Sequence, residues 1–209
     1  MKLLYTGFEP FGGESVNPSF EAIRLLPDSI AGAELVRLEI PTVFGTGAQT
    51  LLAALEHERP DVVICVGQAG GRAAVTPEYV AINYRNARIP DNAGQQPKDQ
   101  RICADGPVGY FTKLPVQSIV ERCHAQGIPA SVSYTAGTYV CNELMYTLLR
   151  AIEHLYPSVI GGFIHVPYSA EQAAAQSVPS PSMPLPMIAD ALRIAGEVTV
   201  SAGQIHGDI

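Results

Sequence analysis

The run DVVICV at residues 61–66 constrains the fold of this chain more than any other feature. It is almost continuously apolar and β-branched, with no alternation of polar residues, so the strand that it predicts must be covered on both of its faces. Strands of this kind occur almost only in parallel sheets that are packed between helices. β-rich runs at residues 2–6, 34–40 and 159–166 are expected to be its neighbours in such a sheet.

Helical patterns separate these runs. Residues 17–26 open with Asn-Pro, a helix-start signal, and residues 143–155 place their apolar side chains on one face of a helix. Further helices are predicted at residues 47–57, 115–126 and 187–198. Alternation of strands and helices predicts an α/β protein, a three-layer α/β/α sandwich with a mostly parallel central sheet.

Four other segments complete the predicted organisation. A short strand is expected at residues 131–134, and residues 79–102, which are rich in Asn, Asp, Arg, Gly and Pro, predict a side hairpin beside the sheet. Residues 177–186 hold four prolines and predict a loop, and the tail 201–209 is expected to fray. Because no linker or internal repeat is visible, we expect residues 1–209 to form a single domain.

Composition argues against several classes of protein. The net charge is −7 without a long run of one sign, which argues against sequence-independent binding of nucleic acid. No apolar run approaches the length of a membrane helix, and the N-terminus lacks the apolar stretch of a signal peptide. The 4 cysteines have no C-x-x-C spacing, so neither a zinc site nor a disulfide framework is indicated. We therefore expect a soluble protein of a reducing compartment that does not bind a membrane.

Glycines and reactive side chains concentrate in the segments that follow the predicted strands, at residues 7–13, 67–72, 134–141 and 165–169. In an open parallel sheet, ligands bind at the carboxyl ends of the strands. The sequence therefore predicts a functional site at that edge of the sheet.

Cys141 is the first candidate in these segments, because it follows the turn TAGTY at the start of a predicted helix. Free N–H groups and the helix dipole at such a position favour an anion, so we expect the pKa of this thiol to lie below the free value of about 8.5. The same N–H groups could hold an oxyanion. A cysteine is more often a small buried hydrophobe, and Cys65, Cys103 and Cys123 have no helix start beside them.

His165 is a candidate base, because it ends the run VIGGFIHV and emerges at the same edge of the sheet. A carboxylate bonded to the far nitrogen of an imidazole fixes its tautomer and supports the imidazolium. Glu78 in TPEYVAIN could provide it, but Glu143, Asp91 and Asp105 are rivals when only the residues are considered.

The residues alone leave several functions open. The loop GQAGGR at residues 67–72 invites a phosphate-binding interpretation, but it matches neither G-x-G-x-x-G nor a P-loop, and a tight turn is the simpler interpretation. A thiol amidase or deacylase for some small acyl group is one alternative. A non-catalytic binder of a small molecule or peptide is another.

Six segments, in order along the chain, carry a resemblance to a known family: TGFEPFGG, GQAGGR, TPEYVAIN, ARIPDNAGQQP, VSYTAGTYVCN and GFIHVPY. With them the chain resembles pyroglutamyl peptidase type I, or pyrrolidone carboxyl peptidase, a family of cysteine peptidases. The resemblance implies hydrolysis of the N-terminal pyroglutamyl group of peptides. It also implies that Glu78, Cys141 and His165 are the acid, nucleophile and base.

The same resemblance implies further properties. Arg88 matches an arginine near the oxyanion, and Phe8, Phe11 and Gln68 match residues that line the pyroglutamate pocket. The family needs no metal or cofactor, is intracellular, and is often a homotetramer, so we expect a cytoplasmic homo-oligomer, a tetramer or a dimer. One residue departs from the family pattern, because Tyr79 stands where a basic residue usually follows the glutamate.

Overall fold

The computed structural model describes residues 1–207. Its centre is a six-stranded sheet in the order β2-β3-β1-β4-β8-β5. The central strands run parallel to one another: β3 (Ala33–Ile40), β1 (Lys2–Phe8), β4 (Val62–Gln68) and β8 (Ile160–Val166). The edge strands run antiparallel to their neighbours: β2 (Ser29–Ile30) and β5 (Thr76–Pro77). The predicted, mostly parallel sheet is confirmed.

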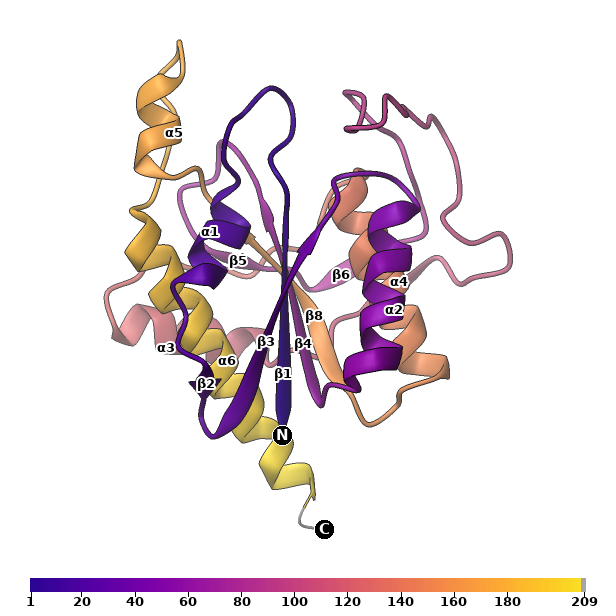
Figure 1. Ribbon diagram of the computed structural model, residues 1–209, viewed down its shortest axis with the longest axis vertical. Helices are drawn as coiled ribbons and strands as arrows, with labels where there is room; N and C mark the ends of the chain where they lie inside the picture. Colours follow the sequence, from indigo (N-terminus) through magenta and orange to yellow (C-terminus); the bar gives the residue numbers. More distant parts are fainter. Residues whose placement is uncertain (208–209) are drawn as a thin grey trace.

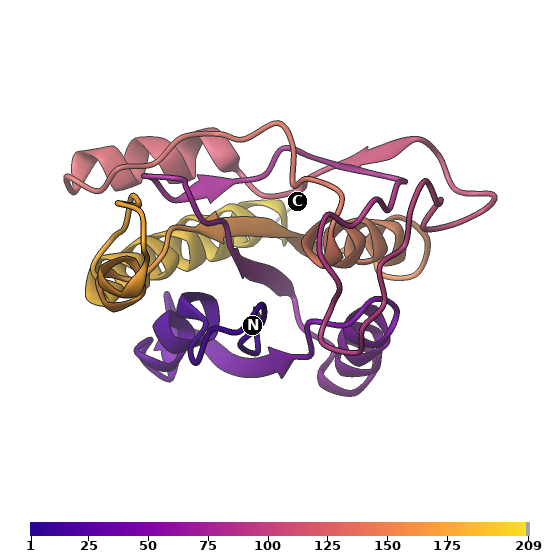
Figure 2. The same cartoon turned by 90° about the horizontal axis from the view of Figure 1, so that it is seen from above.

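Helices cover both faces of this sheet, so the molecule has three layers (Figures 1 and 2). One face carries three helices: α1 (Pro18–Arg24), α3 (Val116–Ala125) and α6 (Leu185–Gly207). The other face carries two: α2 (Thr46–Glu58) and α4 (Val140–His154). The short helix α5 (Ala170–Ala175) follows β8 and lies beyond the carboxyl end of the sheet (Figure 1). Within residues 1–207, no helix has both the length and the apolarity that crossing a membrane requires.

Strand β4 shows why the sheet is covered on both sides. Side chains alternate along a strand, so Val62, Ile64 and Val66 join the core under α1, α3 and α6. Val63 and Cys65 join the core under α2 and α4. All of them are fully buried, which confirms the expectation from the unbroken apolar run.

Helix α1 begins where the Asn-Pro signal predicts, because Asn17 Oδ1 accepts a hydrogen bond from Ser19 N at 3.1 Å. Helix α6 is much longer than the predicted residues 187–198. It continues to Gly207, with Val200 fully buried against the sheet, so the expected fraying of residues 201–207 is wrong. Residues 208–209 of that prediction lie outside the described residues.

Residues 131–134 do not form the regular strand that was predicted. The neighbouring chain at residues 75–79 makes two isolated bridges in this region, Val75 with Ala130 and Glu78 with Ser133, and no continuous strand pairing. The physical reason is Pro77, which has no N–H to donate in the middle of this ladder.

The predicted side hairpin is present, but its second strand lies further along the chain than expected. Strand β6 (Val80–Ile82) pairs antiparallel with β7 (Gly109–Phe111), which lies beyond the predicted residues 79–102. Asn83 ties the start of the segment between these strands to its later part, because its Oδ1 accepts hydrogen bonds from Ile102 N at 2.8 Å and Cys103 N at 2.9 Å.

Candidate active site

The carboxyl ends of β1, β4 and β8 and the first turn of α4 enclose a small cavity of 140 Å³. These elements contribute Phe8, Gln68, His165 and Cys141, respectively. Loop residues complete much of the lining: Phe11, Asn17, Thr42, Thr138 and Tyr139. Pockets for drug-sized ligands measure roughly 300–1,000 Å³, so this cavity is suited to a single small group.

Cys141 is the second residue of α4, at the helix start that the sequence predicts. Its sulfur lies directly against Gly67 of β4. A Cβ atom at Gly67 would lie 3.0 Å from Cys141 Sγ and 2.8 Å from the ring of Phe163. Glycine is therefore required at this position to give the sulfur its place at the cavity.

The expectation of a lowered pKa for Cys141 is wrong for this arrangement. Burial is the largest influence and, together with the negative charge of Glu78, raises the pKa of the thiol to about 12. The charge of Arg72 and a main-chain hydrogen bond oppose this shift without cancelling it. The thiol is therefore protonated at neutral pH, and a base must remove its proton before it can act as a nucleophile.

His165 and Glu78 form a buried hydrogen-bonded pair. His165 Nδ1 lies 2.7 Å from Glu78 Oε1, and neither residue is more than 4% exposed. The short strand β5 produces this contact by running antiparallel to β8, with Thr76 opposite His165. Glu78 N donates to Phe163 O at 2.9 Å, which holds the carboxylate beside the imidazole. The predicted pairing of Glu78 with His165 is present.

Arg72 is a member of this cluster that the sequence did not identify. Its Nη1 donates to Glu78 Oε1 at 2.6 Å, the same oxygen that His165 contacts. It also donates to Thr76 Oγ1, and its Nη2 donates to Thr135 O at 3.2 Å. An arginine that closes a glycine-rich loop shortly before the glutamate is the signal that could have indicated this contact.

The charges of the pair follow from these contacts. Burial alone would raise the pKa of Glu78, but the hydrogen bond and charge of His165, with smaller contributions from hydrogen bonds to Ser133 and Arg72, outweigh burial and lower it. Burial also lowers the pKa of His165, although Glu78 opposes this effect. At neutral pH the pair therefore consists of a carboxylate and a neutral imidazole. With Nδ1–H donated to Glu78, the other ring nitrogen, Nε2, is left as a proton acceptor.

The rival carboxylates are used elsewhere. Glu143 accepts from Arg85 and from Gly45 N, and Asp91 accepts from the main chain of a turn. Asp105 accepts from the thiol of Cys103 at 3.1 Å. Within residues 1–207, none of the three carboxylates has a hydrogen bond or ion pair with His165.

The predicted pocket residues divide between two adjoining spaces. Phe8 packs on Phe163 with a centroid distance of 6.4 Å, and Phe11 packs on Tyr139 at 6.2 Å. Both phenylalanines and Gln68 line the small cavity. Arg88 instead lines an adjoining cleft of 360 Å³, together with Phe11, Gln68 and Tyr139. Tyr139, two residues before Cys141, is a wall that the sequence did not identify.

Tyr79, at the position where the resemblance implies a basic residue, is not part of the cavity lining. Side chains alternate on this extended segment, so Glu78 faces inward and Tyr79 faces outward. Its ring packs against Phe111 at 5.3 Å and Tyr134 at 5.7 Å. Tyr79 therefore belongs to an exposed aromatic cluster and takes no part in the Glu78–His165 contact.

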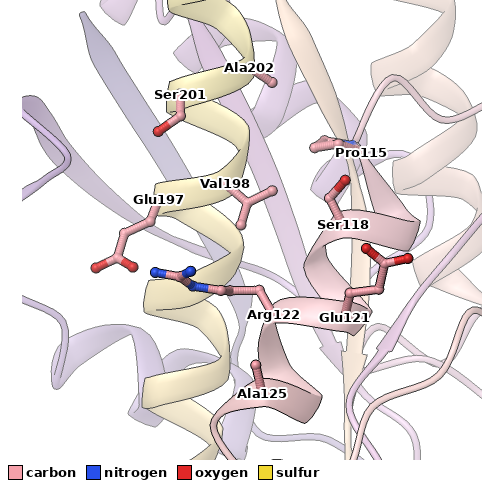
Figure 3. Close-up of a pocket in the computed structure, with 9 residues that line it drawn as sticks. All are labelled: Pro115, Ser118, Glu121, Arg122, Ala125, Glu197, Val198, Ser201 and Ala202. Carbon is pink, nitrogen blue, oxygen red and sulfur yellow. The ribbon is translucent and has the colours of Figure 1, made fainter.

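A wider groove of 590 Å³ lies between α3 and α6 (Figure 3), and it shares no lining residue with the small cavity. Its lining includes Glu121, Arg122 and Glu197. None of the 9 residues that line it is a cysteine or histidine. It therefore offers no nucleophile and base comparable to those of the small cavity.

The fold and the site together define the class of protein. A cysteine at a helix start and a buried histidine–carboxylate pair, at one edge of an α/β sheet, are the arrangement of a cysteine hydrolase. Comparison with known proteins gives the family. The family model for pyroglutamyl peptidase matches residues 1–202, and the chain therefore belongs to the pyroglutamyl peptidase family.

Individual relatives agree with this assignment. A pyrrolidone-carboxylate peptidase of Enterococcus faecalis is 55% identical over 192 residues, which cover 92% of this chain and 90% of the relative. The crystal structure of pyroglutamyl peptidase I from Bacillus amyloliquefaciens superposes with a TM-score of 0.91 at 48% identity, covering 97% of this chain and 98% of that one. The structure of a mutant pyrrolidone carboxyl peptidase from Pyrococcus furiosus superposes with a TM-score of 0.92 at 40% identity, covering 97% of this chain and 99% of that one.

Proposed function

We propose that this chain hydrolyses the bond that follows an N-terminal pyroglutamyl residue of a peptide. In this proposal Cys141 is the nucleophile, His165 the base and Glu78 the residue that orients and stabilises His165. The observation that carries the proposal is the buried Glu78–His165 pair, with its 2.7 Å contact, because His165 lines the same small cavity as Cys141. Membership of the pyroglutamyl peptidase family supports the choice of substrate.

The reaction is an acyl transfer in two stages. His165 Nε2 takes the proton of Cys141 as Sγ attacks the carbonyl carbon after the pyroglutamyl ring. Main-chain N–H groups of the first turn of α4 hold the oxyanion, and Glu78 stabilises the imidazolium. The imidazolium then protonates the leaving amine, which leaves a thioester on Cys141. Water, deprotonated by His165, hydrolyses the thioester and restores the thiol.

Cavity size and charge account for the choice of acyl group. Pyroglutamate is a compact neutral lactam, which suits a space of 140 Å³ with Phe8 and Phe11 among its walls. An ordinary N-terminal residue would bring an ammonium group into this space. Among the lining residues no carboxylate is available to pair with it, so the ammonium would lose its hydration without compensation.

The two arginines receive different roles in this proposal. Arg72 donates to Glu78 Oε1, and its charge adds to the effect of burial in lowering the pKa of His165, which favours the neutral imidazole in the resting enzyme. Arg88 lines the adjoining cleft of 360 Å³, which we assign to the remainder of the peptide, and from there it approaches the side of the substrate carbonyl.

A reporter assay with thiol alkylation tests the proposal. The wild-type protein should release the reporter from a pyroglutamyl amide and not from a prolyl amide, and iodoacetamide should abolish turnover. Cys141→Ser should lose nearly all activity and keep its fold, whereas Cys103→Ser, the matched control at a partly exposed thiol, should retain it. Normal turnover by Cys141→Ser would contradict the nucleophile. Preference for another acyl amide would favour a different thiol amidase.

Two finer expectations stay predictions. One is a cytoplasmic location, and the other is assembly into a tetramer or dimer. Light scattering of the purified protein measures the second.

A further inference from the structure

Most side-chain donors around the small cavity are already used within the protein. Four of its lining residues donate to main-chain carbonyl groups: Asn17 Nδ2 to Glu9 O at 3.0 Å, Thr42 Oγ1 to Glu9 O at 3.2 Å, Thr138 Oγ1 to Asn86 O at 2.9 Å and Tyr139 OH to Pro90 O at 2.9 Å. Apart from the reacting residues Cys141 and His165, Gln68 is the remaining polar side chain of the lining, and the orientation of its amide decides which polar group it offers to a ligand.

Gln172, on the short helix α5, is held in one orientation. Its side chain is buried, with 3% of the residue exposed. Its Oε1 accepts from Ser169 N at 3.1 Å, and its Nε2 donates to Val16 O at 3.1 Å. A main-chain N–H can only donate and a carbonyl oxygen can only accept, so the two ends of this amide cannot be exchanged.

The orientation of Gln172 fixes that of Gln68. The second hydrogen of Gln172 Nε2 is donated to Gln68 Oε1 at 3.0 Å. The oxygen of Gln68 is thereby occupied. Its Nε2 has no hydrogen-bond partner among residues 1–207, and Gln68 lines both the small cavity and the adjoining cleft. Gln68 therefore presents N–H donors, and not its carbonyl oxygen, to a ligand.

We propose that Gln172 is a positioning residue for substrate specificity, which presets Gln68 as a hydrogen-bond donor to a neutral acceptor on the acyl group. In the reaction proposed above, on which this inference rests, that acceptor is the lactam carbonyl of pyroglutamate. If the Gln68 amide were turned, its oxygen would face the lactam oxygen, and two acceptors would be left without a proton between them.

The design of α5 explains how so short a helix can hold this contact. Ser169 and Gln172 form a reciprocal capping box, in which Gln172 N donates to Ser169 Oγ at 3.2 Å. The helix begins shortly after His165, so the same stretch of chain carries the base and the residue that sets the polarity of the pocket.

Gln172→Met tests the inference, because methionine keeps the length of the side chain and removes the donor. We expect KM for a pyroglutamyl reporter amide to rise about tenfold, with kcat within about twofold of wild type, as for an interaction made equally in the bound substrate and the transition state. The matched control is Gln176→Met at the end of the same helix, where Nε2 donates to Glu14 Oε1 at 2.9 Å. It should leave both constants within twofold.

A double-mutant cycle separates this role from a purely structural one. Gln68→Ala should itself raise KM, and Gln172→Met should add nothing further in that background, because there is no amide left to orient. An equal rise of KM in both backgrounds, or an unchanged KM in Gln172→Met, would overturn the inference. If circular dichroism shows that Gln172→Met is unfolded, Gln172→Glu keeps the acceptor for Ser169 and should raise KM at least as much. Lack of turnover by the wild type would instead contradict the proposed function.

Discussion

Two buried glutamates, Glu78 in the site and Glu143 on α4, have similar surroundings and opposite pKa shifts. Each is at most 2% exposed and each pairs with an arginine, Arg72 or Arg85. For both, burial is the largest influence and disfavours the charged form. The pKa of Glu143 is raised, whereas the pKa of Glu78 is lowered, because Glu78 has in addition the hydrogen bond and charge of His165.

The difference teaches what each carboxylate contributes. Glu143 joins three segments. It lies on α4, and it accepts hydrogen bonds from Gly45 N at the start of α2 and from Arg85 in the segment after β6. An ion pair with arginine is therefore sufficient for structure here, even though burial raises the pKa of this carboxyl group. Glu78 stays ionised, and that is the condition for stabilising an imidazolium.

The largest expected difference between the two glutamates is in their effect on kcat. Glu78→Gln should lower kcat about 10³- to 10⁴-fold with little change in KM, because an amide neither fixes the tautomer as a carboxylate does nor stabilises the imidazolium. Glu143→Gln, the matched control, should keep kcat within about tenfold. Steady-state kinetics on a pyroglutamyl reporter amide measures both, and equal losses in the two variants would remove the distinction.

For the stability of the fold, Glu143 is expected to matter more than it does for the rate. Glu143→Gln should lower the free energy of unfolding by about 1–3 kcal/mol, because it leaves Arg85 without its anion. This is less than for a fully buried pair, since the Arg85 side chain is 23% exposed.

The raised pKa of Glu143 adds a dependence on pH to this prediction. The native state holds the proton of Glu143 more tightly than the unfolded state, so its contribution to stability falls as pH rises from 4.5 through the raised pKa. Urea unfolding across this range should show that fall in the wild type and not in Glu143→Gln. An identical pH dependence in both proteins would contradict the raised pKa.

The smallest expected effect is a shift in the pH profile. Arg72 lowers the pKa of His165 through its charge, so Arg72→Met should raise that pKa and keep the imidazole protonated to higher pH. The acid limb of kcat/KM should therefore move to higher pH, with activity close to wild type on the alkaline side. Arg122→Met, at an arginine in the groove of Figure 3, is the control and should leave the limb in place. An unmoved limb in Arg72→Met would mean that Arg72 does not act on the pair.

The sequence predicts what local pattern and strand order determine. The apolar run at residues 61–66, the Asn-Pro start of α1 and the placement of Cys141 and His165 at one edge of the sheet are all found. Contacts between distant segments decide the rest. Residues 201–207 carry a weak apolar pattern, yet they continue α6. The raised pKa of Cys141 depends on burial in the folded protein, and the Arg72–Glu78 pair depends on a strand of two residues that reverses direction.

That strand, β5, has a consequence for how the family can vary. Main-chain hydrogen bonds to β8 set its register, and adjacent side chains along it face opposite ways. A shift of one residue would place Tyr79 where Glu78 lies and turn the carboxylate to the outside. The loop at residues 69–75 can therefore change length during evolution, or by engineering, only where the added or missing residue is absorbed before Thr76.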